Sequence, residues 1–299
     1  NAHRRQRQMC IRDSYNPRCC YRFHREIVMK ELKKFAVIGS PIEHSLSPKI
    51  HSLFAESLGI KISYEALKVE EVEFTTRVRQ LFDEGYDGLN VTLPLKESAF
   101  KFADSLSDDS ILCESVNTLW MEDGSICADT TDGRGLMKDL LNKELDVKDA
   151  KILLLGAGGS AKAIIPALLR NNPESITIAN RTRERAEYLA DRFSSPDRVM
   201  KAIPLSAEID FEPDLIINTS SAGVLDQGMK LPSNIFSNQP SIYDLSYATS
   251  NTPFMNLALS SGSKNCYDGI GMLIEQAALS FQIWTNEVPD TDFDLELLS

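Results

Sequence analysis

The chain has 299 residues, enough for two domains of ordinary size, and its hydrophobic content of 42% is typical of a globular protein. Its net charge of −11 argues against broad nucleic-acid binding, which depends on a basic surface, but leaves room for a local phosphate pocket. No apolar run approaches the ~20 residues that cross a bilayer, so no membrane partner is expected.

The first 28 residues differ in composition from the rest of the chain. They hold seven arginines, two acidic residues and three of the six cysteines. An Arg-rich, acid-poor segment is typical of a transit peptide. We favour another interpretation, in which the string MCIRDS is the translation of a sequencing adapter and the native chain starts at Met29. Residues 1–28 are then a non-native or disordered extension.

The three later cysteines, Cys113, Cys127 and Cys266, are scattered along the chain. Their spacing does not match that of metal ligands, so we expect reduced thiols and no metal site.

In the first half of the chain, apolar runs alternate with amphipathic stretches, which predicts an α/β sheet with right-handed crossovers. Ser47 is expected to cap a helix that ends at Gly59. A hairpin is expected to turn at Asp123–Gly124. Strands are predicted at residues 35–40, 62–69 and 87–93, and helices over 47–58, over 70–85 with Val72, Val78, Leu81 and Phe82 near one face, and over 95–104.

A helix from Asp132 to about Leu145 leads into a second α/β series. Thr252 is expected to cap a helix entered by Pro253. The predicted domains are an N-terminal α/β substrate domain at 29–131 and a Rossmann-type domain at 132–268, with 269–299 assigned to the first. Strands are predicted at 151–156, 175–180, 215–220 and 241–246, and helices at 160–172, 182–193 and 269–286.

A dinucleotide site is indicated by the stretch LLLGAGGSAKA. Gly156, Gly158 and Ala161 match G-x-G-x-x-G/A between a strand and a helix, where a helix N-terminus can bind a pyrophosphate. Lys162 could add charge near the phosphates or face the solvent.

The next strand ends at Asn180 and Arg181, where NAD-binding proteins normally place an acidic residue. Arginines favour a 2′-phosphate, so the sequence predicts NADP over NAD. The alternative is an ordinary basic helix start, in which Arg183 is the arginine most readily explained as solvated.

The stretch NVTLPLKE places Lys96 in the first turn of a helix entered by Pro94. A cation there opposes the helix dipole at a cost of ~0.3–1 kcal/mol, so it is either a tolerated surface charge or a functional group. Asn90 and Thr92 share a face of the preceding strand.

Three other polar groups lie in apolar surroundings. Ser45 and Ser47 precede a helix and could bind a carboxylate, although Ser47 could be only a cap. Asn117 and Asp132 form a second group, and an Asp that opens a helix is usually a plain cap. Gln276 lies in a mostly apolar helix, where a polar residue would ordinarily face the solvent.

Together, the motifs SPIEHSLSP, NVTLPLKE, VNTL, TTDG, GAGGSAKA, NRTRERA and DGIGMLIEQAA resemble those of the shikimate dehydrogenase family over Met29 to Ser299. The resemblance implies a cytoplasmic oxidoreductase, a monomer or homodimer, that reduces 3-dehydroshikimate reversibly with NADPH to shikimate in aromatic amino acid biosynthesis. It also implies that the last helix returns to the first domain and that the active site lies in the interdomain cleft.

The resemblance also carries residue roles. It implies that Lys96 and Asp132 form the catalytic pair. It implies substrate binding by Ser45, Ser47, Thr92, Asn117, Tyr247 and Gln276, together with Asp132. It implies NADP binding by Gly156, Gly158, Gly159, Ala161, Asn180, Arg181, Thr182 and Arg185, with Gly269 and Met272 near the nicotinamide.

Two alternatives remain at this point. One is a quinate/shikimate dehydrogenase that uses NAD, against which Arg181 weighs. The other is a cofactor-sensing protein that has kept the fold and lost turnover, because function lives in the site rather than in the fold. Retention of Lys96 and Asp132 disfavours it.

Overall fold

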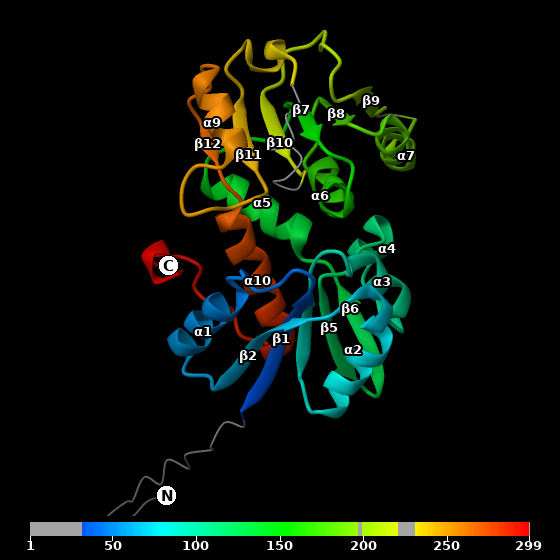
Figure 1. Cartoon of the computed structure of the whole chain (residues 1–299), viewed down its shortest axis with the longest axis vertical. Coiled ribbons are helices and arrows are strands. Elements are labelled where there is room, and N and C mark those ends of the chain that lie inside the picture. Colours follow the sequence, from blue (N-terminus) through cyan, green and yellow to red (C-terminus); the bar gives the residue numbers. More distant parts are fainter. Residues whose placement is uncertain (1–31, 197–198, 221–230, 299) are drawn as a thin grey trace, which may run out of the picture. The chain divides into compact units, whose positions relative to one another are not determined.

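The computed structural model describes residues 32–196, 199–220 and 231–298 (Figure 1), and the predicted extension at 1–28 lies outside them. The first half forms a mixed six-stranded sheet in the order β2-β1-β3-β5-β6-β4. Strand β1 pairs in parallel with β2 and β3, whereas the predicted hairpin joins β5 and β6 in antiparallel fashion. The strands are β1 (Lys33–Gly39), β2 (Ile62–Lys68), β3 (Gly88–Val91), β4 (Ser105–Leu106), β5 (Thr118–Glu122) and β6 (Ser125–Asp129).

The three predicted helices of this first sheet follow the predicted periodicity with one exception, and a fourth helix, at residues 108–113, was not predicted. Val72 was expected on an apolar helix face, but it is 95% exposed, so that prediction is wrong. Residues 71–73 form a separate 3-10 turn, and Val78 and Leu81 bury the apolar face of the helix that follows. The elements are α1 (Ser47–Leu58), η1 (Glu71–Glu73), α2 (Phe74–Asp83), α3 (Lys96–Phe102) and α4 (Asp108–Cys113).

The second sheet has six parallel strands in the order β12-β11-β10-β7-β8-β9. Read from β9, this is the Rossmann order 3-2-1-4-5-6, which reverses between β7 and β10. Ligands bind such sheets at the carboxyl ends of the strands beside that reversal. The elements are β7 (Lys151–Leu155), α6 (Gly159–Arg170), β8 (Ser175–Asn180), α7 (Arg183–Phe193), β9 (Lys201–Pro204), β10 (Leu215–Asn218), η2 (Ser233–Phe236), β11 (Ser241–Asp244), α9 (Pro253–Ser260) and β12 (Cys266–Tyr267).

Two long helices, α5 (Asp132–Asn142) and α10 (Ile270–Thr285), pack against each other, and Figure 1 shows them between the sheets. A Cβ built on Gly135 of α5 would lie 2.7 Å from the Cβ of Gln276, so glycine permits this close crossing. Further along, Phe281 of α10 shares an apolar cluster with Ile50 and Phe54 of α1. The final helix therefore returns to the first sheet, as the resemblance implied.

The ends of the helices agree with the predictions at Gly59 and Thr252 but differ at Ser47. Gly59 ends α1 with φ of 62°, and the Thr252 side chain caps α9 by accepting from the Met255 N–H, both as predicted. Ser47 is not the cap of α1; it is the first helical residue, preceded by Leu46. Pro94 lies before α3, which begins at Lys96. The short strands β4, β9 and β12 were not predicted.

In the described part of the chain, the three cysteines are free thiols, as expected. Burial raises the pKa of Cys113 to about 11, so its thiol stays protonated at neutral pH. Within the same residues, no helix combines the length and the apolar character needed to span a bilayer.

Candidate active site

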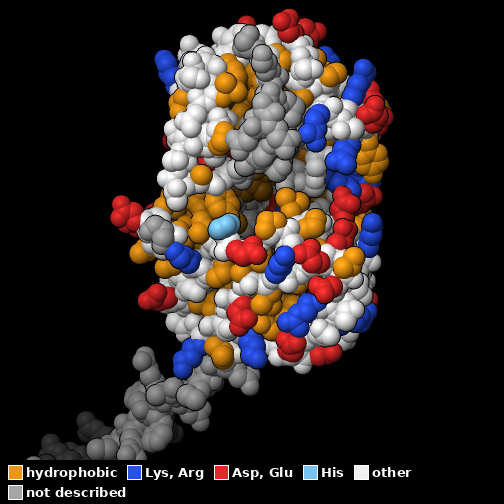
Figure 2. Space-filling model, in the orientation of Figure 1, with side chains coloured by type: hydrophobic (Ala, Val, Ile, Leu, Met, Phe, Trp, Pro, Cys, Tyr) orange, Lys and Arg blue, Asp and Glu red, His pale blue; other side chains and the backbone are white. Residues whose placement is uncertain are grey.

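A cavity of about 320 Å³ is lined by residues from both halves of the described chain. Figure 2 shows a hollow in the face in view, with hydrophobic and histidine side chains at its edge, and His44 is one of the lining residues. All eight side chains expected to act on the substrate line this cavity, together with both residues expected near the nicotinamide: Ser45, Ser47, Thr92, Lys96, Asn117, Asp132, Tyr247, Gln276, Gly269 and Met272.

Lys96 and Asp132 form an ion pair in this cavity, with Nζ 2.5 Å from Oδ2. Their side chains are only 12% and 6% exposed, so water screens the pair weakly. Each residue opens a helix, α3 and α5 respectively. The Asp132 carboxylate does not act as a plain cap, because Thr131 occupies the cap position and the carboxylate points to Lys96.

Asn117 fixes the other oxygen of Asp132. Its Nδ2 lies 3.0 Å from Asp132 Oδ1, 2.8 Å from Thr131 Oγ1 and 2.9 Å from Gln276 Oε1. Its Oδ1 accepts from the Thr131 N–H at 2.9 Å and from the Thr118 hydroxyl at 2.9 Å. The amide therefore has a defined orientation, with its donor side toward the carboxylate.

Gln276 does not face the solvent, so the interpretation of that residue in isolation is wrong. Its Oε1 accepts from Asn117, and its Nε2 donates to Leu273 O at 2.8 Å. The turn of α10 that carries it crosses α5 beside Gly135. This crossing directs the amide into the cavity.

The serine pair lies where α1 begins. Ser45 Oγ accepts from the Ser47 N–H at 3.3 Å, and Ser47 is the first helical residue. Hydroxyls beside free helix N–H groups make a site suited to a carboxylate. Tyr247 also lines the cavity, and its partial burial raises the pKa of the phenol, which therefore stays a neutral hydrogen-bond donor.

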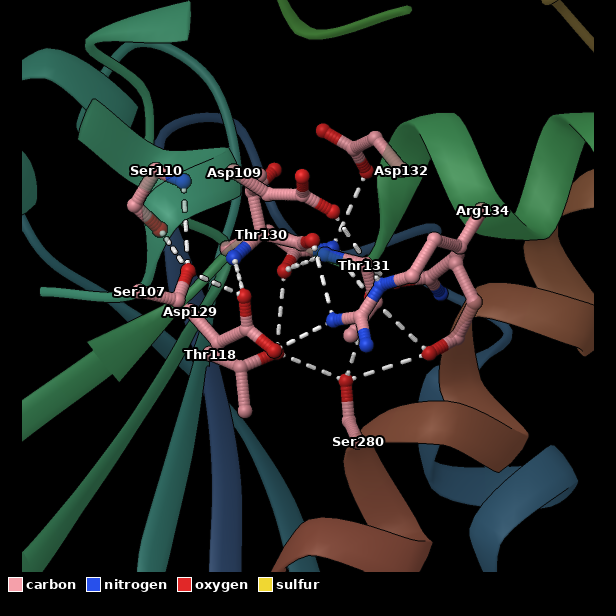
Figure 3. A network of polar contacts seen from close by, with 12 residues as sticks. Ser107, Asp109, Ser110, Thr118, Asp129, Thr130, Thr131, Asp132, Arg134 and Ser280 are labelled. Carbon is pink, nitrogen blue, oxygen red and sulfur yellow. Dashed lines mark hydrogen bonds and ion pairs between the residues drawn. The ribbon is translucent and has the colours of Figure 1, made fainter. Parts of the chain in front are cut away.

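A second polar network supports the turn between β6 and α5. Figure 3 shows Asp129 accepting from Ser107 and Arg134, and Arg134 also donates to Thr130 O at 3.2 Å. Asp129 Oδ1 further accepts from the Thr130 N–H at 2.7 Å. These bonds fix the backbone that leads directly into Asp132.

A second cavity, of about 280 Å³, lies at the carboxyl ends of β7, β8 and β10. Gly156 turns the chain there with φ of 107°, a conformation that L side chains rarely adopt, and a Cβ on it would lie 2.7 Å from Thr219 Oγ1. Ser160 lines both cavities, so the two adjoin. The other expected cofactor residues that line it are Gly158, Gly159, Asn180, Arg181, Thr182 and Arg185.

Ala161 does not line the second cavity; it is fully buried in the core of the second sheet. This is the role expected for the small third residue of the fingerprint, which lets helix and strand pack closely. Asn180 has a clear local role, because its Oδ1 accepts from the Ala157 N–H at 3.2 Å and its Nδ2 donates to Thr182 O at 2.8 Å. Asn180 therefore ties the glycine turn to the turn after β8.

The basic residues of this region have different partners. Arg183 is exposed and pairs with Glu187 at 2.8 Å along α7, which fits the solvated interpretation. Lys162 does not face the solvent, so that interpretation is wrong, and it does not line the second cavity. Its Nζ lies 2.6 Å from Glu114 Oε2, in the segment after α4.

Some cavity residues were not among the predicted site residues. Asn218, Thr219 and Ser220 line the second cavity at the end of β10. The stretch LIINTS could have predicted them, because its last three residues are polar and follow a buried strand. Ligands bind parallel sheets at the carboxyl ends of the strands. Asn90 and His44 line the first cavity, and both stand inside motifs that the sequence singles out.

Comparison with known families gives matches along most of the chain. The family model described as the shikimate dehydrogenase substrate binding domain matches residues 37–119. The model described as shikimate / quinate 5-dehydrogenase matches residues 139–227, and the model of the shikimate 5′-dehydrogenase C-terminal domain matches residues 269–298.

Individual relatives agree with these matches. Proteins named shikimate dehydrogenase (NADP(+)) from Legionella pneumophila and Vibrio atlanticus are 43% and 42% identical, over 89% and 88% of this chain and 98% and 95% of their own lengths. A crystal structure of shikimate 5-dehydrogenase from Thermus thermophilus, in complex with NADP(H) and shikimate, is 33% identical with a TM-score of 0.77, over 87% of this chain and 95% of that one. This chain therefore belongs to the shikimate dehydrogenase family.

Proposed function

We propose that this protein catalyses the reversible NADPH-dependent reduction of 3-dehydroshikimate to shikimate, in the route to chorismate and the aromatic amino acids. The observation that carries the proposal is the buried ion pair of Lys96 and Asp132, in a cavity that adjoins a Rossmann cofactor cavity at Ser160. The named relatives and the family matches support the same activity.

The residues of the first cavity suit the reduction of a ketone. NADPH, when bound, supplies the hydride, while the protein supplies position and a proton. The Lys96 ammonium stabilises the negative charge that develops on the carbonyl oxygen and donates a proton to it. Asp132 holds the ammonium in place through its Oδ2 and accepts a hydrogen bond from a ring hydroxyl.

The remaining polar residues of the cavity bind the substrate in this proposal. Ser45 and Ser47, at the N-terminus of α1, hold the carboxylate. The ring hydroxyls are bound by side chains that converge from the end of β3, the residue before β5, the helix α10 and the loop after β11, namely Thr92, Asn117, Gln276 and Tyr247.

The residues of the second cavity fit NADP. Gly156, Gly158 and Gly159 bring the backbone and the N-terminus of α6 to the pyrophosphate, and Ala161 packs behind them. Arg181 and Arg185, with Thr182, can bind a 2′-phosphate, and no acidic side chain lines this cavity among the described residues. Asn180 holds the glycine turn, and Gly269 and Met272 lie toward the nicotinamide in the first cavity.

The proposal divides the chain by function. Residues 29–131 together with 269–299 bind the substrate, and residues 132–268 bind NADP. We further propose a cytoplasmic enzyme, in keeping with the free thiols Cys113, Cys127 and Cys266. Size-exclusion chromatography with light scattering distinguishes the two proposed oligomeric states, monomer and homodimer.

The test is a spectrophotometric assay of shikimate-dependent NADP⁺ reduction, on a chain that begins at Met29. Quinate and NAD⁺ are measured beside shikimate and NADP⁺ in all four combinations. We expect the shikimate and NADP⁺ pair to give the highest kcat/KM. Faster turnover of quinate with NAD⁺ would favour the quinate alternative, and no turnover of either substrate would favour a cofactor-sensing protein.

A further inference from the structure

A chain of hydrogen bonds between polar side chains runs from the half-buried Tyr64 on β2 to Asp132. The hydroxyl of Tyr64 donates to Asn90 Oδ1 at 2.7 Å, and Asn90 Nδ2 lies 3.0 Å from Ser280 Oγ. Ser280 Oγ lies 2.7 Å from Thr118 Oγ1, which in turn donates to Asn117 Oδ1 at 2.9 Å. Asn117 then donates to Asp132 Oδ1.

The direction of these hydrogen bonds follows from the donors available. A hydroxyl carries one hydrogen, and Thr118 uses its hydrogen on Asn117 Oδ1, which cannot donate. In the contact between Thr118 and Ser280 the donor is therefore Ser280, whose single hydrogen has a second acceptor within reach, Gln276 O at 3.1 Å on the preceding turn of α10. Ser280 can at the same time accept from Asn90. With the Ser280 hydrogen on Thr118, all five bonds point the same way, toward the carboxylate, and such chains polarise one another.

The two hydroxyls in the middle of this hydrogen-bond chain are fully buried. Thr118 on β5 and Ser280 on α10 are both 0% exposed. Figure 3 shows Ser280 reaching from α10 toward Thr118 and Thr131. Neither hydroxyl lines either cavity, so neither can touch a bound substrate or cofactor there.

We propose that Thr118 and Ser280 are positioning residues that orient the amide of Asn117 toward Asp132. The inference rests on the proposed function, because it concerns the geometry of the Lys96 and Asp132 pair. Thr118 supplies one of the two hydrogen bonds that hold Asn117 Oδ1, the other coming from the Thr131 N–H. When Ser280 donates to Thr118 Oγ1, it fixes the direction in which the Thr118 hydroxyl points.

The consequence is a carboxylate held from both sides. Asn117 holds Oδ1 of Asp132 and Lys96 holds Oδ2. Loss of the Thr118 hydroxyl leaves Asn117 Oδ1 with a single donor and lets the amide rotate. A looser amide lets the carboxylate turn away from the ammonium, which costs rate more than binding of the cofactor.

The test compares Thr118→Val, which is close in shape and lacks the hydroxyl, with Thr118→Ser, which keeps it. We expect Thr118→Val to lower kcat by about three- to tenfold, the effect of one hydrogen bond. We expect Thr118→Ser to restore kcat to within about twofold of the unaltered chain, and KM for NADP⁺ to stay within about twofold in both variants. Turnover is expressed per folded molecule, from circular dichroism on the same samples.

Ser280→Ala removes the hydrogen bond to Thr118 and leaves the bond from Thr118 to Asn117 in place. It provides a second variant if Thr118→Val does not fold. It should lower kcat less than Thr118→Val, because Thr118 can still donate to Asn117. In the double variant, kcat should fall no further than in Thr118→Val alone, since both changes act through one amide.

Ser115→Ala is the matched control. Ser115 is fully buried in the same segment, and its hydroxyl has no hydrogen-bond partner among the described residues. We expect kcat to be unchanged in this variant. The inference is overturned if Thr118→Val and Ser280→Ala lose thermal stability while kcat per folded molecule stays within about twofold of the unaltered chain. Absence of turnover in the unaltered chain would instead count against the proposed function.

Discussion

Lys162 on α6 and Glu114 after α4 form an ion pair, with Nζ 2.6 Å from Oε2, that joins the second-sheet half of the chain to the first. Arg192 on α7 adds a contact of 2.9 Å to the other oxygen of Glu114. The Lys162 side chain is only 10% exposed, whereas Glu114 is 33% exposed. Glu114 thus holds two helices that flank the cofactor strands against the substrate-binding half.

Removing the two partners of this pair should have unequal effects on stability. Glu114→Gln leaves a buried ammonium without a counterion, and we expect it to lower the free energy of unfolding by about 1–3 kcal/mol. Lys162→Met leaves Glu114 paired with Arg192 and should cost less. Urea unfolding of both variants measures the difference. If both variants lose the same free energy of unfolding, the Lys162 ammonium is not the more costly of the two charges to leave without its partner.

The pair also carries a pH dependence. The hydrogen bond from Lys162, followed by the charges of Lys162 and Arg192, lowers the pKa of Glu114 below 4.5. A carboxyl with a depressed pKa contributes stability that is present above its unfolded value and lost as the pH falls through its folded value. We therefore expect the stability difference between the unaltered chain and Glu114→Gln to shrink below pH 4.5.

Loss of the Lys96 ammonium should affect the chemical step. Lys96→Ala removes the proposed proton donor, and we expect kcat to fall by about 100-fold or more while KM for shikimate rises far less. Steady-state assays at saturating NADP⁺ measure both constants. Lys101→Ala, an exposed lysine on the same helix, is the control and should keep kcat. An unchanged kcat in Lys96→Ala would exclude Lys96 as the proton donor.

Cofactor choice should depend on Arg181 rather than on Arg183. Both arginines are exposed, but only Arg181 lines the cofactor cavity, while Arg183 pairs with Glu187. Arg181→Ala should raise KM for NADP⁺ by about tenfold or more, the value of a charge-assisted bond to phosphate, and leave KM for NAD⁺ nearly unchanged. Arg183→Ala should change neither constant. A similar rise for both cofactors in Arg181→Ala would mean that the residue does not read the 2′-phosphate.

Much of the fold could be predicted because its signals are local. The glycine turn at Gly156, the end of α1 at Gly59 and the cap at Thr252 each depend on a few adjacent residues. The strands β4, β9 and β12 could not be predicted in this way. They are only two to four residues long, too short for a periodic pattern.

The residues that were misread depend on contacts between distant segments. Gln276 turns inward because α10 crosses α5 at Gly135, and Lys162 is buried because Glu114 lies opposite. Neither contact can be read from the helix pattern that contains the residue. The family motifs, by contrast, brought together side chains that the structure places in one cavity. Of the two buried hydroxyls behind that cavity, Thr118 lies within the motif VNTL but was given no role, and Ser280 lies outside every motif.

The buried histidine His51 on α1 should make the stability of the folded protein depend on pH. It is 0% exposed, stacks on Tyr64 with ring centroids 4.2 Å apart, and lies beside Phe54, Phe281 and Trp284. Neither ring nitrogen has a hydrogen-bond partner among the described residues. Burial lowers the pKa of His51 to about 3, so the folded protein keeps it neutral.

The sign of the effect follows from where the proton binds. Between pH 6.5 and about 3 the unfolded chain binds a proton at His51 that the folded chain does not. His51 therefore reduces stability by roughly 1.4 kcal/mol for each pH unit below that upper limit. His51→Phe keeps an aromatic ring in an aromatic site and removes both unpaired nitrogens, so it should raise stability at neutral pH by about 1–3 kcal/mol.

Urea unfolding from pH 7 to pH 4.5 measures both effects. The free energy of unfolding should fall less steeply with decreasing pH in His51→Phe than in the unaltered chain. His44→Gln, which replaces an exposed histidine in the loop between β1 and α1, is the control and should leave the slope as it is. If His51→Phe and the unaltered chain lose stability in parallel across this range, His51 is protonated in the folded protein. Its neutral burial between Tyr64 and the aromatic residues of α10 would then be disproved.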